Sequence, residues 1–203
     1  RLSMWLPTGG AGAFDAQEWD ALCDPASSAV KALSIGVDAP PSRESATVCV
    51  AGLRADGALH VEWYETQEGV TWLPAWLAPR LGPKVRAVVV DARNPLAELE
   101  WRAAGIRPTL TGARDVAAAA GGLFDAVADG RVRHRGQVEL TRGALGAKVR
   151  PMVGGQGFGW DRKAPGSSAL IAASLALWGV EAPKPLRPRV SRPGEGRGAI
   201  TVL

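Results

Sequence analysis

The sequence predicts a mixed α/β domain whose central sheet carries helices on both faces. Three strand patterns come first, at residues 32–38, 45–53 and 57–64, and an Asp-Gly turn signal joins the second to the third. Helices and strands then alternate along the chain. The continuous β-branched run at residues 85–91 is typical of a central strand that is buried on both faces. A meander followed by alternating elements favours a mixed sheet.

Helical patterns fill most of the remaining chain. Trp72 and Trp76 have helical spacing, although two prolines interrupt their segment, and Asn94 followed by Pro95 is a typical helix start. The last helix is apolar almost all round, which predicts that it is buried. The expected helices cover residues 69–81, 94–104, 113–129, 136–148 and 167–179. Short extended pieces are expected at 106–111 and 131–134, and a Gly-rich loop with room for a short strand precedes the last helix.

The chain of 203 residues divides into three parts. Residues 1–30 are expected to form a linker arm that packs on the domain, with Asp15 capping a short helix. Residues 31–181 form the domain itself. Residues 182–203 are rich in Pro, Arg and Gly, which predicts a flexible tail. Because the chain begins without Met, we expect it to be a fragment of a longer protein.

The composition narrows the classes of function. The net charge is +4 with a pI near 9.5, and much of the basic excess lies late in the chain, which suits a polyanion such as DNA. No apolar run is long enough to span a membrane. The two cysteines are not spaced as a metal pair, so reduced thiols are expected. The Gly-rich segment VGGQGFG lacks the lysine of a phosphate loop, which argues against nucleotide binding by that route.

Two predicted strands end on an acid, Asp38 in SIGVD and Asp91 in AVVVD. If these strands are neighbours, both carboxylates lie at the sheet edge where open α/β sheets bind ligands. Asp161, just before the last helix, is the candidate for a third acid. Converging carboxylates repel one another unless a cation neutralises them, and Mg²⁺ or Mn²⁺ prefers such oxygen ligands. Two ions about 4 Å apart are the arrangement that cleaves phosphodiesters.

Simpler interpretations compete with this one. A strand-end aspartate often only caps a turn. Arg93, Arg162 and Lys163 are candidates for phosphate contacts beside the acids, but surface arginines and lysines also serve only to solvate a fold. If these residues do contact DNA, binding should fall steeply with salt and show little sequence preference.

Four segments together resemble the C-terminal nuclease domain of tailed-phage terminase large subunits. They are SIGVDAPPSRESATVCVAG, VRAVVVDARNP, GLFDAVADGRVRHRGQVEL and GWDRKAPGSSALIAASLALWG. The resemblance covers roughly residues 1–181, and its most specific parts are FDAVADGRVRH before a helix and WDRK before an apolar helix. The opening MWLPTGGAGAFDAQEWDALCDP resembles the segment that links the family's ATPase domain to its nuclease.

The resemblance implies a ribonuclease H-like fold with a mixed five-stranded central sheet and a two-metal site of clustered acids. It places the family's first acid at Asp38 and the second at Asp91. The third usually lies at or just before the start of the last helix, where this chain has Gly166, Ser167 and Ser168. Asp161 lies five residues before Gly166, so either it completes the site or one metal is held more weakly.

The expected function is a metal-dependent endonuclease that uses two Mg²⁺ or Mn²⁺ ions to cut concatemeric double-stranded viral DNA during genome packaging. The resemblance implies portal protein and terminase small subunit as partners, no membrane, and action in the host cytoplasm. One alternative is a non-catalytic DNA- or portal-docking module with a degenerate site. Another is a different ribonuclease H-like nuclease, of the resolvase or transposase type.

Overall fold

A computed structural model describes residues 12–93, 98–152 and 157–182, and within these residues the central sheet has six strands. Their order across the sheet is β5-β4-β1-β2-β3-β6. The strands are β1 (Lys31–Asp38), β2 (Ser45–Leu53), β3 (Leu59–Glu68), β4 (Val85–Asp91), β5 (Thr109–Thr111) and β6 (Val132–His134). A separate antiparallel pair consists of β7 (Val149–Pro151) and β8 (Phe158–Trp160).

The sheet is mixed, as the sequence predicts. β1 pairs antiparallel with β2 and β2 antiparallel with β3, whereas β1 and β4, β4 and β5, and β3 and β6 pair parallel. The expected number of five strands is corrected to six, because the short extended piece at 131–134 pairs with the start of β3. Three residues carry too little periodicity to show this pairing in advance.

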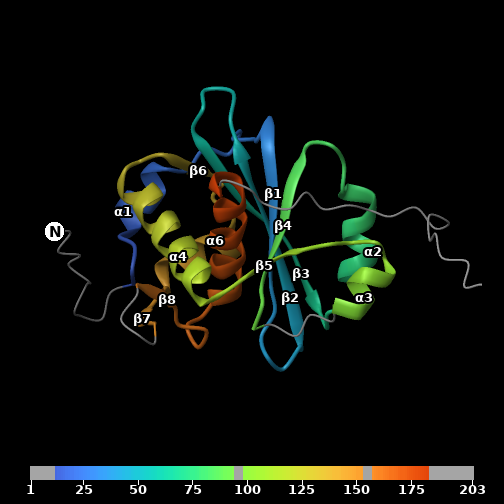
Figure 1. The fold of residues 1–203 in the computed structure, drawn as a ribbon. Helices are drawn as coiled ribbons and strands as arrows, with labels where there is room; N and C mark the ends of the chain where they lie inside the picture. The colour runs from blue at the N-terminus through green and yellow to red at the C-terminus, as the bar shows by residue number, and fades with distance from the viewer. Residues whose placement is uncertain (1–11, 94–97, 153–156, 183–203) are drawn as a thin grey trace, which may run out of the picture.

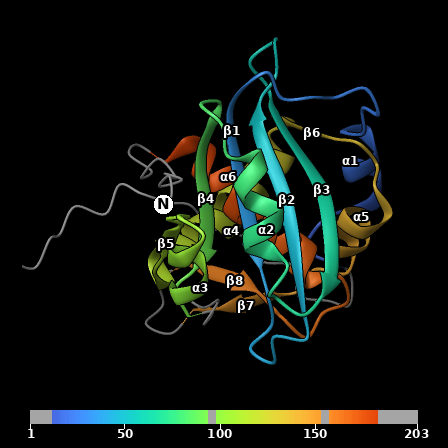
Figure 2. The same ribbon diagram turned by 90° about the vertical axis from the view of Figure 1, so that its right-hand side faces the viewer.

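Helices cover both faces of the sheet (Figures 1 and 2). One hydrophobic core lies between the sheet and α1, α4, α5 and α6, and a second lies between the sheet and α2 and α3. The helices are α1 (Ala16–Ala21), α2 (Leu73–Leu77), α3 (Glu98–Ala103), α4 (Ala113–Ala128), α5 (Val138–Leu145) and α6 (Ser167–Glu181). Of the helices in the described part of the chain, none is long and apolar enough to cross a membrane.

Most predicted helices are present, and the exception has a local cause. The expected helix at 69–81 is reduced to α2 and a 3-10 turn, Ala78–Arg80. Pro74 fits the first turn of α2, but Pro79 has no backbone N–H to continue an α-helix. The predicted cap at Asn94 and Pro95, the first 11 residues of the arm, and the tail from residue 183 lie outside the described residues.

The buried helix α6 lies directly against β1, and two glycines permit this approach. A Cβ at Gly36 on β1 would lie 2.0 Å from the carbonyl oxygen of Ala172, and one at Gly179 on α6 would lie 2.1 Å from Ser34 Oγ. Any larger residue would force the two elements apart. The contact sets the start of α6, and the turn before it, beside the carboxyl end of β1.

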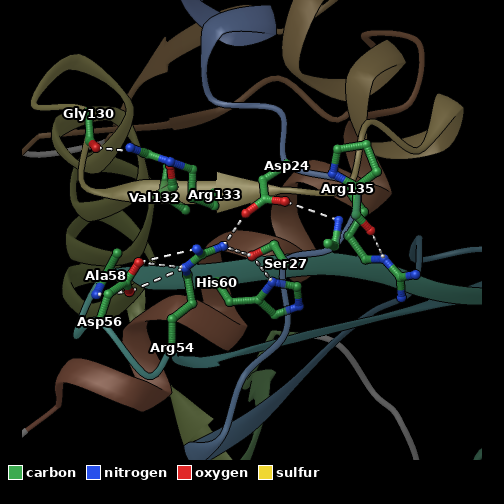
Figure 3. A network of polar contacts seen from close by, with 12 residues as sticks. Asp24, Ser27, Arg54, Asp56, Ala58, His60, Gly130, Val132, Arg133 and Arg135 are labelled. Carbon is green, nitrogen blue, oxygen red and sulfur yellow. Dashed lines mark hydrogen bonds and ion pairs between the residues drawn. The ribbon is translucent and has the colours of Figure 1, made fainter.

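Residues 12–30 contact the opposite end of the sheet through a cluster of polar side chains, shown in Figure 3 and called here the arm cluster: Asp24, Ser27, Arg54 and His60. Arg54 Nη1 donates to Asp24 Oδ2 at 2.6 Å and to Ser27 Oγ at 2.7 Å. Ser27 Oγ lies 2.9 Å from His60 Nδ1, and both side chains are buried. The arm cluster therefore ties the N-terminal segment to the β2–β3 hairpin.

A second histidine holds the same segment. His134 Nε2 lies 2.8 Å from the carbonyl oxygen of Trp19, and the two rings stack with centroids 4.1 Å apart. Gly136 N–H donates to His134 Nδ1 at 3.1 Å, so Nδ1 is an acceptor and Nε2 carries the proton. This neutral form suits a buried ring, and burial lowers the pKa of His134.

Candidate functional site

Asp38 and Asp91 are the last residues of two neighbouring parallel strands. β1 and β4 pair in register with Val37 opposite Val90, so the next residue of each strand is the aspartate. Both residues are buried, at 0% and 1% exposed. The structure thus brings together the two acids that the sequence singles out. Buried acids are rare without a charge partner, and each of these has an arginine.

Arg162 spans the two carboxylates from the turn between β8 and α6. Its Nη1 donates to Asp38 Oδ1 at 2.8 Å and to Oδ2 at 3.1 Å, and its Nη2 lies 3.5 Å from Asp91 Oδ2. A single guanidinium therefore contacts both acids. The Arg162 side chain is one-third exposed, so it reaches the pair from the solvent side.

Arg93 binds Asp91 from within the same turn of chain. Its backbone N–H donates to Asp91 Oδ1 at 2.9 Å, and its Nε and Nη2 donate to the carboxylate at 3.1–3.2 Å and 2.7 Å. Half of the Arg93 side chain is exposed. Because the backbone takes part, the Arg93 contact is a local feature of the strand end.

The two carboxyl groups differ in their acidity. Burial raises the pKa of Asp38, and it outweighs the Arg162 guanidinium and the Ser168 hydroxyl, which both favour the ionised form. Burial also opposes ionisation of Asp91, but the hydrogen bonds from Arg93 prevail and hold the pKa of Asp91 below its ordinary value. A pair of close acids with divergent pKa values is common at functional sites.

Asp161 is not brought to the pair. Its carboxylate oxygen Oδ1 accepts a hydrogen bond from the backbone N–H of Lys163 at 3.0 Å, so it closes its own turn. Among the described residues, no group of three or more His, Cys, Asp or Glu side chains is placed to hold a metal ion. The role of Asp161 as third ligand stays a prediction.

The backbone at the start of α6 excludes an acid at position 166. Gly166 has a φ of +72°, and a Cβ on it would lie 2.7 Å from the backbone nitrogen of Gly143, so only glycine fits. Ser167 is buried, and its hydroxyl donates to the carbonyl oxygen of Arg162 at 2.9 Å. Ser168 is the residue of this turn whose side chain interacts with Asp38.

A cleft of about 220 Å³ opens beside Asp91. Three arginines line it together with the strand-end acid, and its remaining wall comes from the turn after β1. The lining residues are Ala39, Pro41, Asp91, Arg93, Arg150 and Arg162. Of the predicted phosphate contacts, Arg93 and Arg162 therefore face the cleft, whereas Lys163 is exposed and is not among its lining residues.

Arg150 is the site residue that sequence reasoning misses. It belongs to β7, which pairs with β8 across the segment that the sequence shows only as Gly-rich. The basic stretch AKVRP is visible in the sequence, but its distance from both acids gives no sign of their proximity. The arrangement joins two oxygen-donor acids, suited to a hard cation, to arginines suited to a phosphate.

Comparison with known proteins identifies relatives in structure. No protein-family model matches the chain, and no curated protein matches it in sequence. The large terminase of bacteriophage HK97 superposes with a TM-score of 0.65 at 18% identity, over 81% of this chain and 43% of that one. The large terminase of a thermophilic bacteriophage gives 0.58 at 15% identity, over 81% and 43%.

The large terminase nuclease of another thermophilic phage, G20c, with bound cobalt, gives a TM-score of 0.53 at 16% identity, over 79% of this chain and 94% of that one. The chain thus corresponds in extent to that nuclease, and it spans less than half of the two large terminases. At sequence identities this low, the superpositions show a shared fold and not a shared activity. The chain has the ribonuclease H-like fold of the nuclease domain of phage large terminases.

Proposed function

We propose that the protein is a metal-dependent endonuclease that cuts double-stranded viral DNA during genome packaging. The observation that carries this proposal is the buried pair Asp38 and Asp91, set side by side at the carboxyl ends of β1 and β4 and next to an arginine-lined cleft. The fold shared with the terminase nucleases supports this assignment by analogy.

The residues present fit a divalent cation. Both ligand candidates are carboxylates, the Ser168 hydroxyl is a third oxygen nearby, and Mg²⁺ and Mn²⁺ prefer such donors with water completing the shell. Structures of the G20c nuclease contain cobalt in one case and magnesium in another. Asp38 and Asp91 would hold one ion between them, and the proposed second ion requires a further ligand, for which Asp161 is the candidate.

The chain's own residues divide the chemical work. A bound metal ion supplies Lewis acidity and a nucleophilic water at neutral pH. Arg93 and Arg150 line the cleft where they can bind the phosphate next to the scissile bond and stabilise the charge that develops on it. Arginine contacts to phosphate oxygens position the duplex and carry no sequence information.

The wider role is also a proposal. The chain spans 43% of the HK97 large terminase. In a packaging motor it would act with an ATPase domain, a portal protein and a terminase small subunit, as the resemblance to tailed-phage terminases implies. The terminase architecture supports these partners, and action in the host cytoplasm follows from the same role.

A second candidate function is a DNA-docking module without nuclease activity. It is favoured by the ion pair of Arg162 with both acids and by the lack of a third acid at the pair within the described residues. Such a module would use the arginines of the cleft and leave the carboxylates paired. It predicts DNA binding with no cleavage at any metal concentration.

Conversion of supercoiled plasmid to nicked and linear forms in Mg²⁺ or Mn²⁺ separates the two. We expect cleavage by the wild type and its loss in Asp38→Asn and Asp91→Asn, with unchanged circular dichroism. Asp125→Asn, on the exposed side of α4, is the matched control and should cut normally. Equal cleavage by all four proteins would contradict the proposal, and binding without cleavage by the wild type would favour the docking module.

A further inference from the structure

We propose that Arg162 is the resident counter-cation of the carboxylate pair and that a divalent ion must displace it to bind. This inference rests on the proposed metal-dependent function and concerns how the site is regulated. Arg162 then sets the metal concentration that is needed to fill the site.

The guanidinium of Arg162 lies where a cation between the two acids would bind. Arg162 Nη1 contacts both oxygens of Asp38, and Nη2 faces Asp91 Oδ2. These are the oxygens that a cation between the two strands would have to coordinate. Because Arg162 contacts both acids at once, a divalent ion between the carboxylates would occupy the position of its guanidinium, whereas Arg93 contacts Asp91 alone from its own turn. Occupancy by one therefore excludes the other.

The charges at the site are balanced without a metal. The pair has two negative charges, and Arg93 neutralises one of them from within the turn of Asp91. The remaining charge belongs to Asp38, and within the described part of the chain it is Arg162 that neutralises it. At the start of α6 the chain has Gly166, Ser167 and Ser168, so no further acid is added there. Arg93 and Arg162 together thus keep the site neutral without a metal.

The backbone of the turn that contains Arg162 is held in place by hydrogen bonds. The Ser167 hydroxyl holds the carbonyl oxygen of Arg162, and a backbone hydrogen bond from Ala164 to Asp161 closes the same turn. Only the side chain needs to move, and it is already one-third exposed and lines the cleft with Arg150. Displacement would therefore add a free guanidinium to the phosphate side of the site. By linkage, a phosphate that engages Arg162 would strengthen metal binding.

The test is the affinity for Mn²⁺, measured by calorimetry and by electron paramagnetic resonance without DNA, so that no activity enters the result. In Arg162→Gln the affinity should rise by at least about tenfold, the size expected for one charge-assisted hydrogen-bonded pair. Lys163→Gln removes an equal charge from the exposed neighbouring residue and should change the affinity by less than about twofold.

Arg162→Lys keeps a cation but loses the planar fork, so its affinity should lie between those of the wild type and Arg162→Gln. This variant also keeps the test valid if Arg162→Gln does not fold. Without metal, the melting temperature of Arg162→Gln should fall by about 5–10 °C, because a buried carboxylate loses its partner, and saturating Mn²⁺ should restore more of it than in the wild type.

The possible results separate the inference from the function on which it rests. If Mn²⁺ binds the wild type, Lys163→Gln and Arg162→Gln equally, or binds Arg162→Gln more weakly, the role of Arg162 is overturned and the metal site stands. If Mn²⁺ binds none of the proteins, or binds Asp38→Asn as well as the wild type, the metal site itself is wrong and the inference falls with it.

Discussion

The two ends of the central sheet carry two clusters of polar side chains, each with two buried members, and they differ in how their charges are paired. At the carboxyl ends of β1 and β4, Asp38 and Asp91 meet arginines that arrive from the solvent side, beside an open cleft. At the opposite end, Arg54 of the arm cluster lies between Asp24 and Ser27 and joins the N-terminal segment to the hairpin.

The two clusters differ in what their cations do for the fold. In the arm cluster the cation is placed between the segments that it joins, so removing it disconnects them. In the carboxylate pair the strands are already joined by the sheet, and the cations only compensate charge. A charge partner of the second kind can be exchanged for another cation without loss of the fold, which is what a metal site requires.

The largest expected effect on stability comes from the contact that positions the carboxylate pair. Gly36→Ala should lower the free energy of unfolding by about 3 kcal/mol, because its Cβ would collide with the backbone of α6. Urea unfolding measures the loss. Gly121→Ala, on α4 with open space around it, should instead stabilise by about 0.5–1 kcal/mol. Equal effects of the two changes would show that α6 does not pack closely on β1.

Substitutions in the arm cluster should lower the stability of the protein and leave its activity unchanged. Ser27→Ala leaves His60 Nδ1 without its partner and removes one of the two hydrogen bonds of Arg54 Nη1, which should cost about 1–3 kcal/mol of unfolding free energy. Ser28→Ala, at the exposed neighbouring position, should be neutral. Plasmid cleavage should be unchanged in both. Lost cleavage in a stably folded Ser27→Ala protein would mean that the two ends of the sheet are coupled.

Arg150 should contribute to the binding of DNA and not to the binding of metal. Arg150→Gln should reduce the slope of log affinity against log salt concentration by about 1, because one phosphate contact is lost. Its affinity for Mn²⁺ should stay the same, since it is Arg93 and Arg162 that contact the acids. Arg131→Gln, an exposed arginine at the arm end, serves as the control and should leave the slope unchanged. An unchanged slope in Arg150→Gln would remove the cleft from the proposed DNA path.

The smallest effect should be a pH dependence at the arm end. Burial lowers the pKa of His134, so the unfolded chain takes up a proton more readily than the folded one. The stability from neutral His134 is therefore complete above about pH 6.5 and is lost as the pH falls toward the folded-state pKa. Urea unfolding at several pH values between about 7.5 and 5 should show this loss in the wild type and less of it in His134→Gln. Identical pH profiles of the wild type and His134→Gln would contradict the neutral form of His134 that is inferred from the hydrogen bond of Gly136 N–H to Nδ1.

The sequence predicts those parts of the site that depend on local pattern. Asp38 and Asp91 follow apolar strand runs, and two such strands in one sheet bring their ends to one edge, so this pair was predictable. The partners of the acids were not, because the contact of Arg162 with Asp38 joins residues 124 positions apart. Arg150 depends on the pairing of two three-residue strands, which leaves no periodic signal.

Asp161 shows a different limit. The sequence gives its carboxylate and its place before the last helix, but not the competing hydrogen bond to the backbone of Lys163 that holds it in its own turn. Short polar side chains often make such local bonds. The extended piece at 131–134 was predicted, but its pairing as a sixth strand was not, because that pairing depends on the neighbour β3 and not on the pattern of Val132–His134 itself.

The most direct test of the metal site is a crystal structure of the protein soaked in Mn²⁺. We expect an anomalous peak within about 2.2 Å of carboxylate oxygens from both Asp38 and Asp91, with the Arg162 side chain turned away from them. The same map would show whether Asp161 joins the ligands. Arg162 still bound to both acids at saturating Mn²⁺, with no peak between the strands, would contradict the account.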